Sequence, residues 1–493
     1  MRELRLAALA ALAALAFLSL SCGARQARPS DPPPPAPVPD GETWVAHLRD
    51  ELAPFWTTPQ ALGTPVGAFP TFRCDDGSLL DRDLPCSELT LPGRWVSGYV
   101  GREYARMRSR QTFFYGVAYH LTGEERFLEW ARAGAAWLRA NAFDRQTGSA
   151  VSWWENGVGG PALLERTSQD LAYANLGVAF YAYLTRDPEA IADAVRLKEH
   201  VFREYDDAAF GTLRWARVGP GGQTGRKELV APLDQMNAYL LLLAPVVPEP
   251  HATAFKNDLR RLARHLIERY WSEEHGLFRG TVHDPAEPVL GSRHTDFGHT
   301  IKALWMIERT GALTRDEALS RFAREKAPVV LARAYNPAVG CWASGVRQDG
   351  SLDAGLTWWI SAELDQMAAT LALTDRAPTG YLARTYACWR ERFVDREHCE
   401  VFAFVDPNDP SRRIGKAHLW KNGYHSAEHA LVAYLTSQEL KKRPATLHFA
   451  FRAVPPRESL RPYFFSGELV SLREEGTTGD GLTRSVATFR GIR

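Results

Sequence analysis

The chain has 493 residues, of which 45% are hydrophobic, and its formal net charge at pH 7 is +1. This apolar content is enough for a large buried core. A near-neutral chain without a long basic run lacks the electrostatic footprint that nucleic acid binding requires, so we expect no nucleic acid partner.

The first 22 residues have the features of a bacterial lipoprotein signal. Arg2 and Arg5 precede an apolar run over 6–20, and small residues lead to Cys22. Such a segment directs a protein out of the cytoplasm, and lipidation of Cys22 would leave it extracytoplasmic, anchored to a bacterial membrane only through the lipid. The apolar run is short for a transmembrane span, and an ordinary cleaved signal is the plain alternative. Residues 23–41, which include "DPPPPAPVPD", then predict a stiff, Pro-rich tether.

Five cysteines lie beyond the signal. Cys74 with Cys86, and Cys388 with Cys399, are close enough in sequence for local disulfides, which an extracytoplasmic compartment permits. This pairing leaves Cys341 single. No spacing is typical of a zinc site, so we predict no metal.

Two kinds of helix alternate six times between residues 42 and 440. The first kind is apolar nearly all round, with polar or aromatic residues in its first turn. Five of these helices have markers separated by 65, 64, 60 and 64 residues, at Ser168, Leu233, Phe297, Thr357 and Lys421, and a sixth contains "SRQTFFYGVAYHL". This regularity indicates an internal repeat.

The second kind of helix has one charged face. We expect these helices over 43–55, 125–141, 188–205, 252–271, 314–334 and 381–393. An aromatic residue, a polar turn and usually a glycine follow each one, which is typical of a short hairpin.

This alternation predicts a mainly α fold, an (α/α)6 barrel with short hairpin loops over residues 42–440. Helices that are apolar all round must be buried, and helices with one charged face must cover them. Two unequal bundles or an open helical solenoid are alternatives, although a solenoid would need polar capping repeats. Residues 441–493 alternate apolar and polar side chains, which predicts a small β-rich extension.

In such a barrel, the entrances of the inner helices converge on one central cavity. The candidates to face it are Arg110, Asp170, Asp234, His299, Glu363, Trp420, Lys421, Tyr424 and His425. Each of these residues could instead have a purely structural role. A histidine or aspartate at a helix start is often a cap, tryptophans fill cores, and a lysine stem covers apolar surface.

Four stretches carry a resemblance to a known family. "SRQTFFYGVAYHLTGEERFLEWA", "FGHTIKALW", "WWISAE" and "LWKNGYH" resemble, in this order, motifs of the N-acylglucosamine 2-epimerase superfamily. That superfamily includes cellobiose 2-epimerases and mannose-type aldose–ketose isomerases on (α/α)6 barrels. The resemblance spans roughly Trp44 to Leu435.

The resemblance implies roles for individual residues. His299 and His425 would be the acid/base pair, Arg110 and Glu363 would contact the sugar, and Trp359 and Trp420 would shape the pocket. Beyond the resemblance, we add four further residues to the expected substrate-binding set: Asp234, Asn237, Lys302 and Tyr424.

The chain departs from the family pattern at two places. The third inner helix, "PLDQMNAYLLLL", lacks the usual histidine and glutamate, so that Asn237, or Asp234 in a shifted register, takes the place of the histidine. Lys302 stands where the family's Gly-His-x-x-Glu motif has its glutamate. The family groups credited with ring opening and substrate placement are thus missing from these positions.

The chemistry implied by the remaining residues is proton transfer at C2 of a sugar. A base that is neutral near pH 7 is needed beside a carbonyl, and imidazole, with a usual pKa of about 6.5, suits this task. Two histidines on opposite faces could invert C2, and Arg110 could stabilise the enediolate oxygen. Lys302 would lower the pKa of a nearby histidine or add a second oxyanion contact.

Three functions follow as hypotheses. The first is an epimerase or isomerase acting on a reducing sugar or oligosaccharide, a small-molecule carbohydrate, outside the cytoplasm. The second is a glycoside hydrolase on the same fold that uses Asp234 and Glu363, with carboxyl groups about 6.5–9.5 Å apart if it inverts. The third is a catalytically inactive carbohydrate-binding lipoprotein. We expect no cofactor, because no glycine-rich phosphate loop opens a helix after a strand.

Overall fold

The computed structural model describes residues 33–90, 96–155, 162–164, 167–217, 223–283 and 288–493. The expected signal, Cys22 and the tether up to residue 32 lie outside the described residues, so lipid anchoring and location stay predictions. Within the described part of the chain, we find no helix with both the length and the apolar character needed to cross a bilayer.

Six inner helical segments form a closed ring. They are α6 (Ala105–Thr122), α8 (Ser168–Thr185), the continuous run α10 (Val230–Gln235), η4 (Met236–Leu240) and α11 (Leu241–Leu243), then α13 (Phe297–Thr314), α15 (Trp358–Ala372) and α17 (Tyr424–Leu440). Each segment packs against the next, and α17 packs back against α6. Every residue of α8 is buried, as expected for a helix that is apolar all round.

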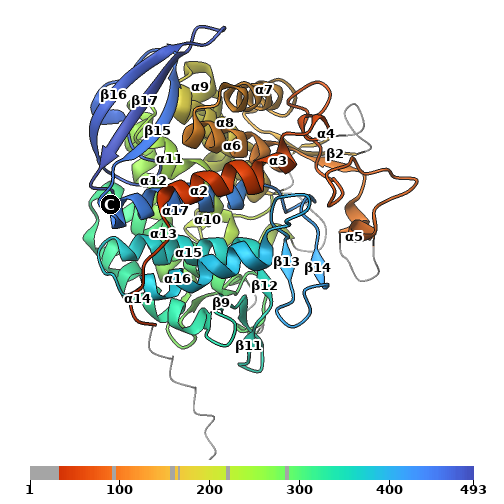
Figure 1. Cartoon of the computed structure of the whole chain (residues 1–493), viewed down its shortest axis with the longest axis vertical. Helices are drawn as coiled ribbons and strands as arrows, with labels where there is room; N and C mark the ends of the chain where they lie inside the picture. Colours follow the sequence, from red (N-terminus) through yellow and green to blue (C-terminus); the bar gives the residue numbers. More distant parts are fainter. Residues whose placement is uncertain (1–32, 91–95, 156–161, 165–166, 218–222, 284–287) are drawn as a thin grey trace, which may run out of the picture. The chain divides into compact units, whose positions relative to one another are not determined.

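Six outer helical segments cover this ring (Figure 1). They are α2 (Gly41–Ala46) with η1 (His47–Leu52) and α3 (Ala53–Trp56), α7 (Glu125–Asn141), α9 (Pro188–Glu204), α12 (His251–His265) with η5 (Leu266–Tyr270), α14 (Glu317–Ala334), and α16 (Thr379–Cys388) with η6 (Trp389–Phe393). In α12 only one face is buried, whereas its charged residues remain at the surface. The expected (α/α)6 barrel is confirmed.

Short strands follow the outer helices, as the hairpin signals indicate. Antiparallel pairs join β4 (Asp206–Asp207) to β5 (Thr212–Leu213), β6 (Trp271–Ser272) to β7 (Leu277–Phe278), β8 (Tyr335–Asn336) to β9 (Cys341–Trp342), and β10 (Gly345–Val346) to β11 (Leu352–Asp353). Two three-stranded sheets contain β1 (Arg102–Tyr104), β2 (Val151–Glu155) and β3 (Ala162–Leu164), and β12 (Leu356–Thr357), β13 (Phe404–Val405) and β14 (Arg413–Ile414). The remaining short helices are α4 (Pro59–Leu62), α5 (Ser87–Thr90), η2 (Ser97–Tyr99), η3 (Gln223–Gly225) and η7 (Arg457–Ser459).

The C-terminal residues form one antiparallel sheet in the order β15-β17-β16. Its strands are β15 (Ala445–Phe451), β16 (Glu468–Thr477) and β17 (Thr483–Arg490). In Figure 1 this blue sheet lies beside α6 and α8, and β15 packs against both helices. The hydroxyl of Tyr119 in α6 donates a hydrogen bond to the carbonyl of Phe449 in β15, at 2.8 Å.

One of the two expected disulfides is wrong. Cys74–Cys86 is present, but Cys388 pairs with Cys341, and Cys399 is a half-buried free thiol. Proximity in sequence favoured Cys399 as the partner of Cys388. The barrel instead packs α16 against β9, and this contact brings the Cα atoms of Cys341 and Cys388 to 5.6 Å.

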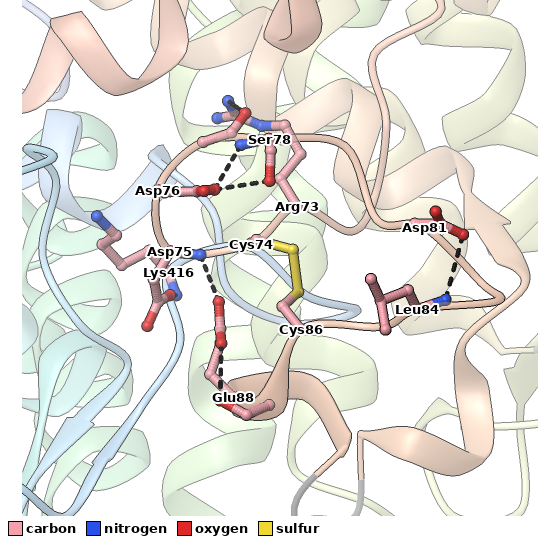
Figure 2. Close-up of a disulfide and its surroundings, with 12 residues drawn as sticks. Arg73, Cys74, Asp75, Asp76, Ser78, Asp81, Leu84, Cys86, Glu88 and Lys416 are labelled. Carbon is pink, nitrogen blue, oxygen red and sulfur yellow. Dashed lines mark hydrogen bonds between the residues drawn. A yellow bond between two sulfur atoms is a disulfide. The ribbon is translucent and has the colours of Figure 1, made fainter.

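The Cys74–Cys86 disulfide closes a short loop in which Asp75 and Glu88 lie close together (Figure 2). The backbone amide of Asp75 donates to Glu88 at 2.7 Å, and the amide of Lys416 donates to Asp75 at 2.9 Å. A small apolar cluster of Phe72, Leu89, Val96, Tyr104, Met107, Trp153 and Leu419 joins this loop to the chain before Trp420. The disulfide loop is thus packed against the segment that leads into α17.

Candidate active site

A cavity of about 380 Å³ opens where the inner helices begin. All six inner segments contribute side chains to it, mostly from their first turns. The lining residues are Arg110, Gln169, Tyr173, Asp234, Arg293, His294, His299, Lys302, Thr357, Trp358, Trp359, Ala403, Phe404, Ile414, His418, Trp420 and His425. Polar groups thus converge with aromatic walls at one end of the barrel.

His299 is held at the start of α13 by Asp296. The Asp296 carboxylate caps the helix by accepting the His299 backbone N–H at 2.7 Å, and its other oxygen lies 2.7 Å from Nδ1 of the His299 ring. Burial alone would raise the pKa of Asp296, but the neighbouring His299 lowers it overall. With a carboxylate at Nδ1, the nitrogen left for chemistry in the cavity is Nε2.

His425 lies in the first turn of α17, with Nδ1 3.5 Å from Oε1 of Glu363. Burial, followed by the positive charges of Arg110 and Lys302, lowers the pKa of His425 well below its usual value. The imidazole is therefore neutral near pH 7, which is the form that can accept a proton. Lys302 thus lowers the pKa of a histidine, as predicted, although burial lowers the pKa of His425 more.

Trp359 lies against both histidines. Its ring centroid is 4.7 Å from that of His299 and 6.0 Å from that of His425. The reason is the order of the inner ring, because α15 is the neighbour of both α13 and α17. A ligand in contact with Trp359 would therefore lie close to both imidazoles.

Arg110 places a positive charge in the cavity lining, beside Tyr173. Its Nη1 donates to the Trp420 carbonyl at 2.8 Å, and its guanidinium lies 3.9 Å from the ring centroid of Tyr173. Its buried Nε has no hydrogen-bond partner in the described structure, and no described carboxylate forms an ion pair with Arg110. A positive group with unused donors is suited to an anionic oxygen.

Lys302 forms a buried ion pair with Asp234. Its ammonium lies 2.7 Å from Oδ1 of Asp234 and donates to the Tyr173 hydroxyl at 2.9 Å. Gln169 donates to the other Asp234 oxygen at 2.8 Å. Although burial would lower the pKa of Lys302, Asp234 raises it overall, so this lysine stays protonated. The pair is thus a fixed polar wall.

Three residues of the expected substrate-binding set lie behind the cavity lining. Asn237 donates from Nδ2 to the Tyr424 hydroxyl at 2.7 Å, and both side chains are buried. Glu363 is fully buried behind His425. Asn237, Tyr424 and Glu363 can therefore position cavity residues without lining the cavity themselves.

Two further expectations of cavity exposure are wrong. Asp170 pairs with buried Arg106, at 2.5 Å, because the α8 helix turns it toward α6. Lys421 pairs with Glu400 at 2.9 Å, and both side chains are completely buried. Trp420, the neighbour of Lys421, does line the cavity. Only some of the residues at this helix entrance therefore face the cavity.

Sequence reasoning missed six polar lining residues, which are Gln169, Tyr173, Arg293, His294, Thr357 and His418. Gln169 and Tyr173 are one turn apart on α8, and their spacing of four residues was a usable signal that both face the cavity. His294 and Arg293 precede α13 in a loop that belongs to no quoted motif. Only the folded loop places them in the lining.

Glu363, His425 and Glu428 form a buried group that could offer three ligand atoms to a cation within 4.8 Å of one another. Burial, together with the neighbouring carboxyl group of Glu428, raises the pKa of Glu363 well above its usual value. Burial also raises the pKa of Glu428 to about 6. A carboxyl pair of this kind retains a proton, which reduces the negative charge beneath His425.

Comparison with known proteins identifies relatives in sequence. The cellobiose 2-epimerase of Ruminococcus albus is 24% identical over 338 residues, which cover 65% of this chain and 84% of that protein. The cellobiose 2-epimerase of Bacteroides fragilis is 25% identical over 361 residues, covering 65% of this chain and 85% of that protein. No family model matches the chain.

Solved structures share the fold. The cellobiose 2-epimerase of Spirochaeta thermophila superposes with a TM-score of 0.67 at 19% identity, over 81% of this chain and 96% of that one. A D-mannose isomerase gives a TM-score of 0.63 at 16% identity, over 80% and 97% of the two chains. This chain is thus similar to cellobiose 2-epimerases in sequence and shares the (α/α)6 barrel of their solved structures, in agreement with the resemblance to the N-acylglucosamine 2-epimerase superfamily.

Proposed function

We propose that this sugar epimerase or isomerase moves a proton at C2 of a reducing sugar or oligosaccharide by means of His299 and His425. One observation carries the proposal: both imidazoles line one cavity, and both lie close to the ring of Trp359. A sugar stacked on this indole would bring C2 between two proton-transfer groups.

In the proposed reaction, one neutral imidazole accepts the C2 proton from the open-chain aldehyde. The electrons of the C–H bond form the enediolate, and its oxygen is stabilised by the Arg110 guanidinium. Delivery of a proton to the other face of C2 gives the epimer, whereas delivery to C1 gives the ketose. His425 is suited to start as the base because its pKa is lowered.

The geometry supports hydrolysis less well. Both oxygens of Asp234 are already engaged by Lys302, Tyr173 and Gln169, and Glu363 is buried behind His425. A hydrolase needs an accessible acid and a second carboxylate on the other side of the glycosidic bond. These two candidates do not provide that pair.

Solvent deuterium exchange tests the proposal. The chain is incubated in heavy water with reducing monosaccharides and disaccharides, and deuterium at C2 is measured by NMR. We expect incorporation, with a loss of about 100-fold or more in His299→Gln and in His425→Gln. His251→Gln, on the outer face of α12, is the matched control and should keep the wild-type rate.

Two results would argue against the proposal. One is an exchange rate that survives both cavity substitutions. The other is the absence of exchange together with release of new reducing ends from glycosides, which would indicate hydrolysis.

A further inference from the structure

A third histidine faces the cavity beside the proposed acid/base pair. The ring centroid of His294 lies 4.8 Å from that of His299, and both side chains line the same cavity. His294 belongs to none of the motifs that carry the family resemblance. Its place in the wall therefore needs a separate explanation.

The backbone holds His294 in an unusual conformation. Its φ is +60°, in the left-handed region that residues other than glycine rarely adopt. The loop lies tightly against the segment that follows β7. A Cβ atom added at Gly280 would lie 1.9 Å from the Arg293 carbonyl oxygen, and the hydroxyl of Thr295 accepts the Gly280 amide at 2.8 Å. A costly conformation maintained by the surrounding contacts is a common feature of functional sites.

A buried carboxylate orients the His294 ring. Nδ1 of His294 lies 3.2 Å from Oε2 of Glu228, whose side chain is 1% exposed. Burial alone would raise the pKa of Glu228, but its hydrogen bond with His294 lowers it overall. Burial is also the main cause that lowers the pKa of His294. A neutral ring that donates Nδ1–H to an ionised Glu228 satisfies both groups.

The other ring nitrogen is then an acceptor. Nε2 of His294 receives the Nε–H of Arg293 at 3.3 Å, and Arg293 is an exposed side chain that a ligand can displace. The remaining histidine of the wall has the opposite tautomer: His418 accepts the Trp420 backbone N–H on Nδ1, at 3.3 Å, so its hydrogen is on Nε2. His294 can therefore act as a base, whereas His418 is a donor.

We propose that Glu228 and His294 form a proton-transfer dyad that opens the sugar ring before His299 and His425 act at C2. This inference rests on the proposed function, since proton removal from C2 requires the open-chain aldehyde. The positions where relatives have the corresponding groups do not supply a base here. Asn237 does not titrate and lies behind the lining, and Lys302 stays protonated in its pair with Asp234.

The proposed ring opening needs only the sugar and the His294 imidazole, because every proton and electron pair moves between them. Nε2 accepts the proton of the anomeric O1–H, the C1–O5 bond breaks with its electron pair going to O5, and C1–O1 becomes the carbonyl. The proton on Nε2 is then delivered to O5. O1 and O5 are both bonded to C1, so one ring can reach both, and C2 is the next carbon, toward the adjacent His299. Glu228 stabilises the transient imidazolium.

Ring opening is measurable without C2 chemistry, because opening and reclosing interconvert the two anomers. Single anomers of glucose, mannose and cellobiose are dissolved with the full chain, and the approach to anomeric equilibrium is followed by polarimetry. We expect the wild type to accelerate this approach. His294→Asn should lose at least tenfold of the acceleration.

Asparagine is the chosen replacement because it tolerates the left-handed backbone, and unchanged thermal melting would show that the loop still folds. Glu228→Gln is the second variant and should also slow mutarotation, whereas His251→Gln should not. Full acceleration in His294→Asn, or none in the wild type, would overturn the dyad. Mutarotation that depends on His294 without any C2 exchange would leave the dyad standing and refute the proposed function instead.

Discussion

Three cavity histidines share one arrangement, in which Nδ1 faces a carboxyl group. The pairs are His299 with Asp296, His294 with Glu228 and His425 with Glu363. At His299 and His294 the partner is hydrogen-bonded, which holds the ring orientation and leaves Nε2 for the cavity, whereas Nδ1 of His425 lies 3.5 Å from Glu363 without a hydrogen bond. The partners differ, because Asp296 and Glu228 have lowered pKa values whereas that of Glu363 is raised. The arrangement therefore combines two ionised partners with one that retains a proton.

At the residue scale, we predict that Lys302→Gln raises the pKa of His425. A nearby cation disfavours the imidazolium, so its removal favours protonation and moves the titration upward toward the usual 6.5. The measurement is a histidine NMR titration, with His425→Asn used to assign the signal. Lys302→Arg keeps the charge and should leave the titration in place. A downward shift in Lys302→Gln would contradict the assigned role of this lysine.

At the element scale, the hairpins that follow the outer helices connect neighbouring repeats. The strand β9 packs against α16 of the next repeat, and the disulfide Cys341–Cys388 lies at this contact. The two cysteines are 47 residues apart, so the bond closes a long loop in the unfolded chain. Such a bond restricts the unfolded ensemble more than a short local one does.

We predict that replacing Cys341 and Cys388 together by serine lowers the free energy of unfolding by about 2–4 kcal/mol. Chemical denaturation checks the loss, and peptide mapping without reduction should recover the Cys341–Cys388 link. Cys399→Ser is the control and should leave stability nearly unchanged. Burial raises the pKa of the Cys399 thiol, so its alkylation in the native chain should be slow. A Cys388–Cys399 peptide would refute the pairing.

At the scale of the whole molecule, the C-terminal segment reaches the core of the barrel. The hydroxyl of Tyr463 donates to Oε1 of Glu428 in α17 at 2.5 Å, and both residues are buried. Glu428 belongs to the carboxyl pair beneath His425. The segment after the last barrel helix thus contacts the support of the active site.

We predict that Tyr463→Phe costs about 1–3 kcal/mol of stability and that the cost is larger at pH 8 than at pH 5. The folded pKa of Glu428 is raised to about 6, so stability from its neutral form is present at low pH and is lost as pH rises through 6. The Tyr463 hydrogen bond lowers this pKa, so it matters most for the ionised form. Denaturation at both pH values measures the difference. Tyr434→Phe, whose hydroxyl is hydrogen-bonded to the backbone of Thr446, should show no such pH dependence.

The sequence by itself determined the barrel and the main cavity residues. Helical periodicity is local, so apolar and one-sided helices can be told apart without knowing their neighbours. Their strict alternation then leaves few ways to bury six apolar helices. The same logic placed Arg110, Asp234, His299, Trp420 and His425 at helix entrances, and all five line the cavity.

Only the tertiary structure decided which distant groups meet. Lys302 pairs with Asp234 across 68 residues of sequence, and His294 meets Glu228 across 66. The partner of Cys388 and the position of Glu363 behind His425 likewise depend on how neighbouring repeats pack. These contacts arise between helices and loops of different repeats. The distances between these groups are set when the ring of helices closes, and they cannot be predicted from the spacing of the residues along the chain.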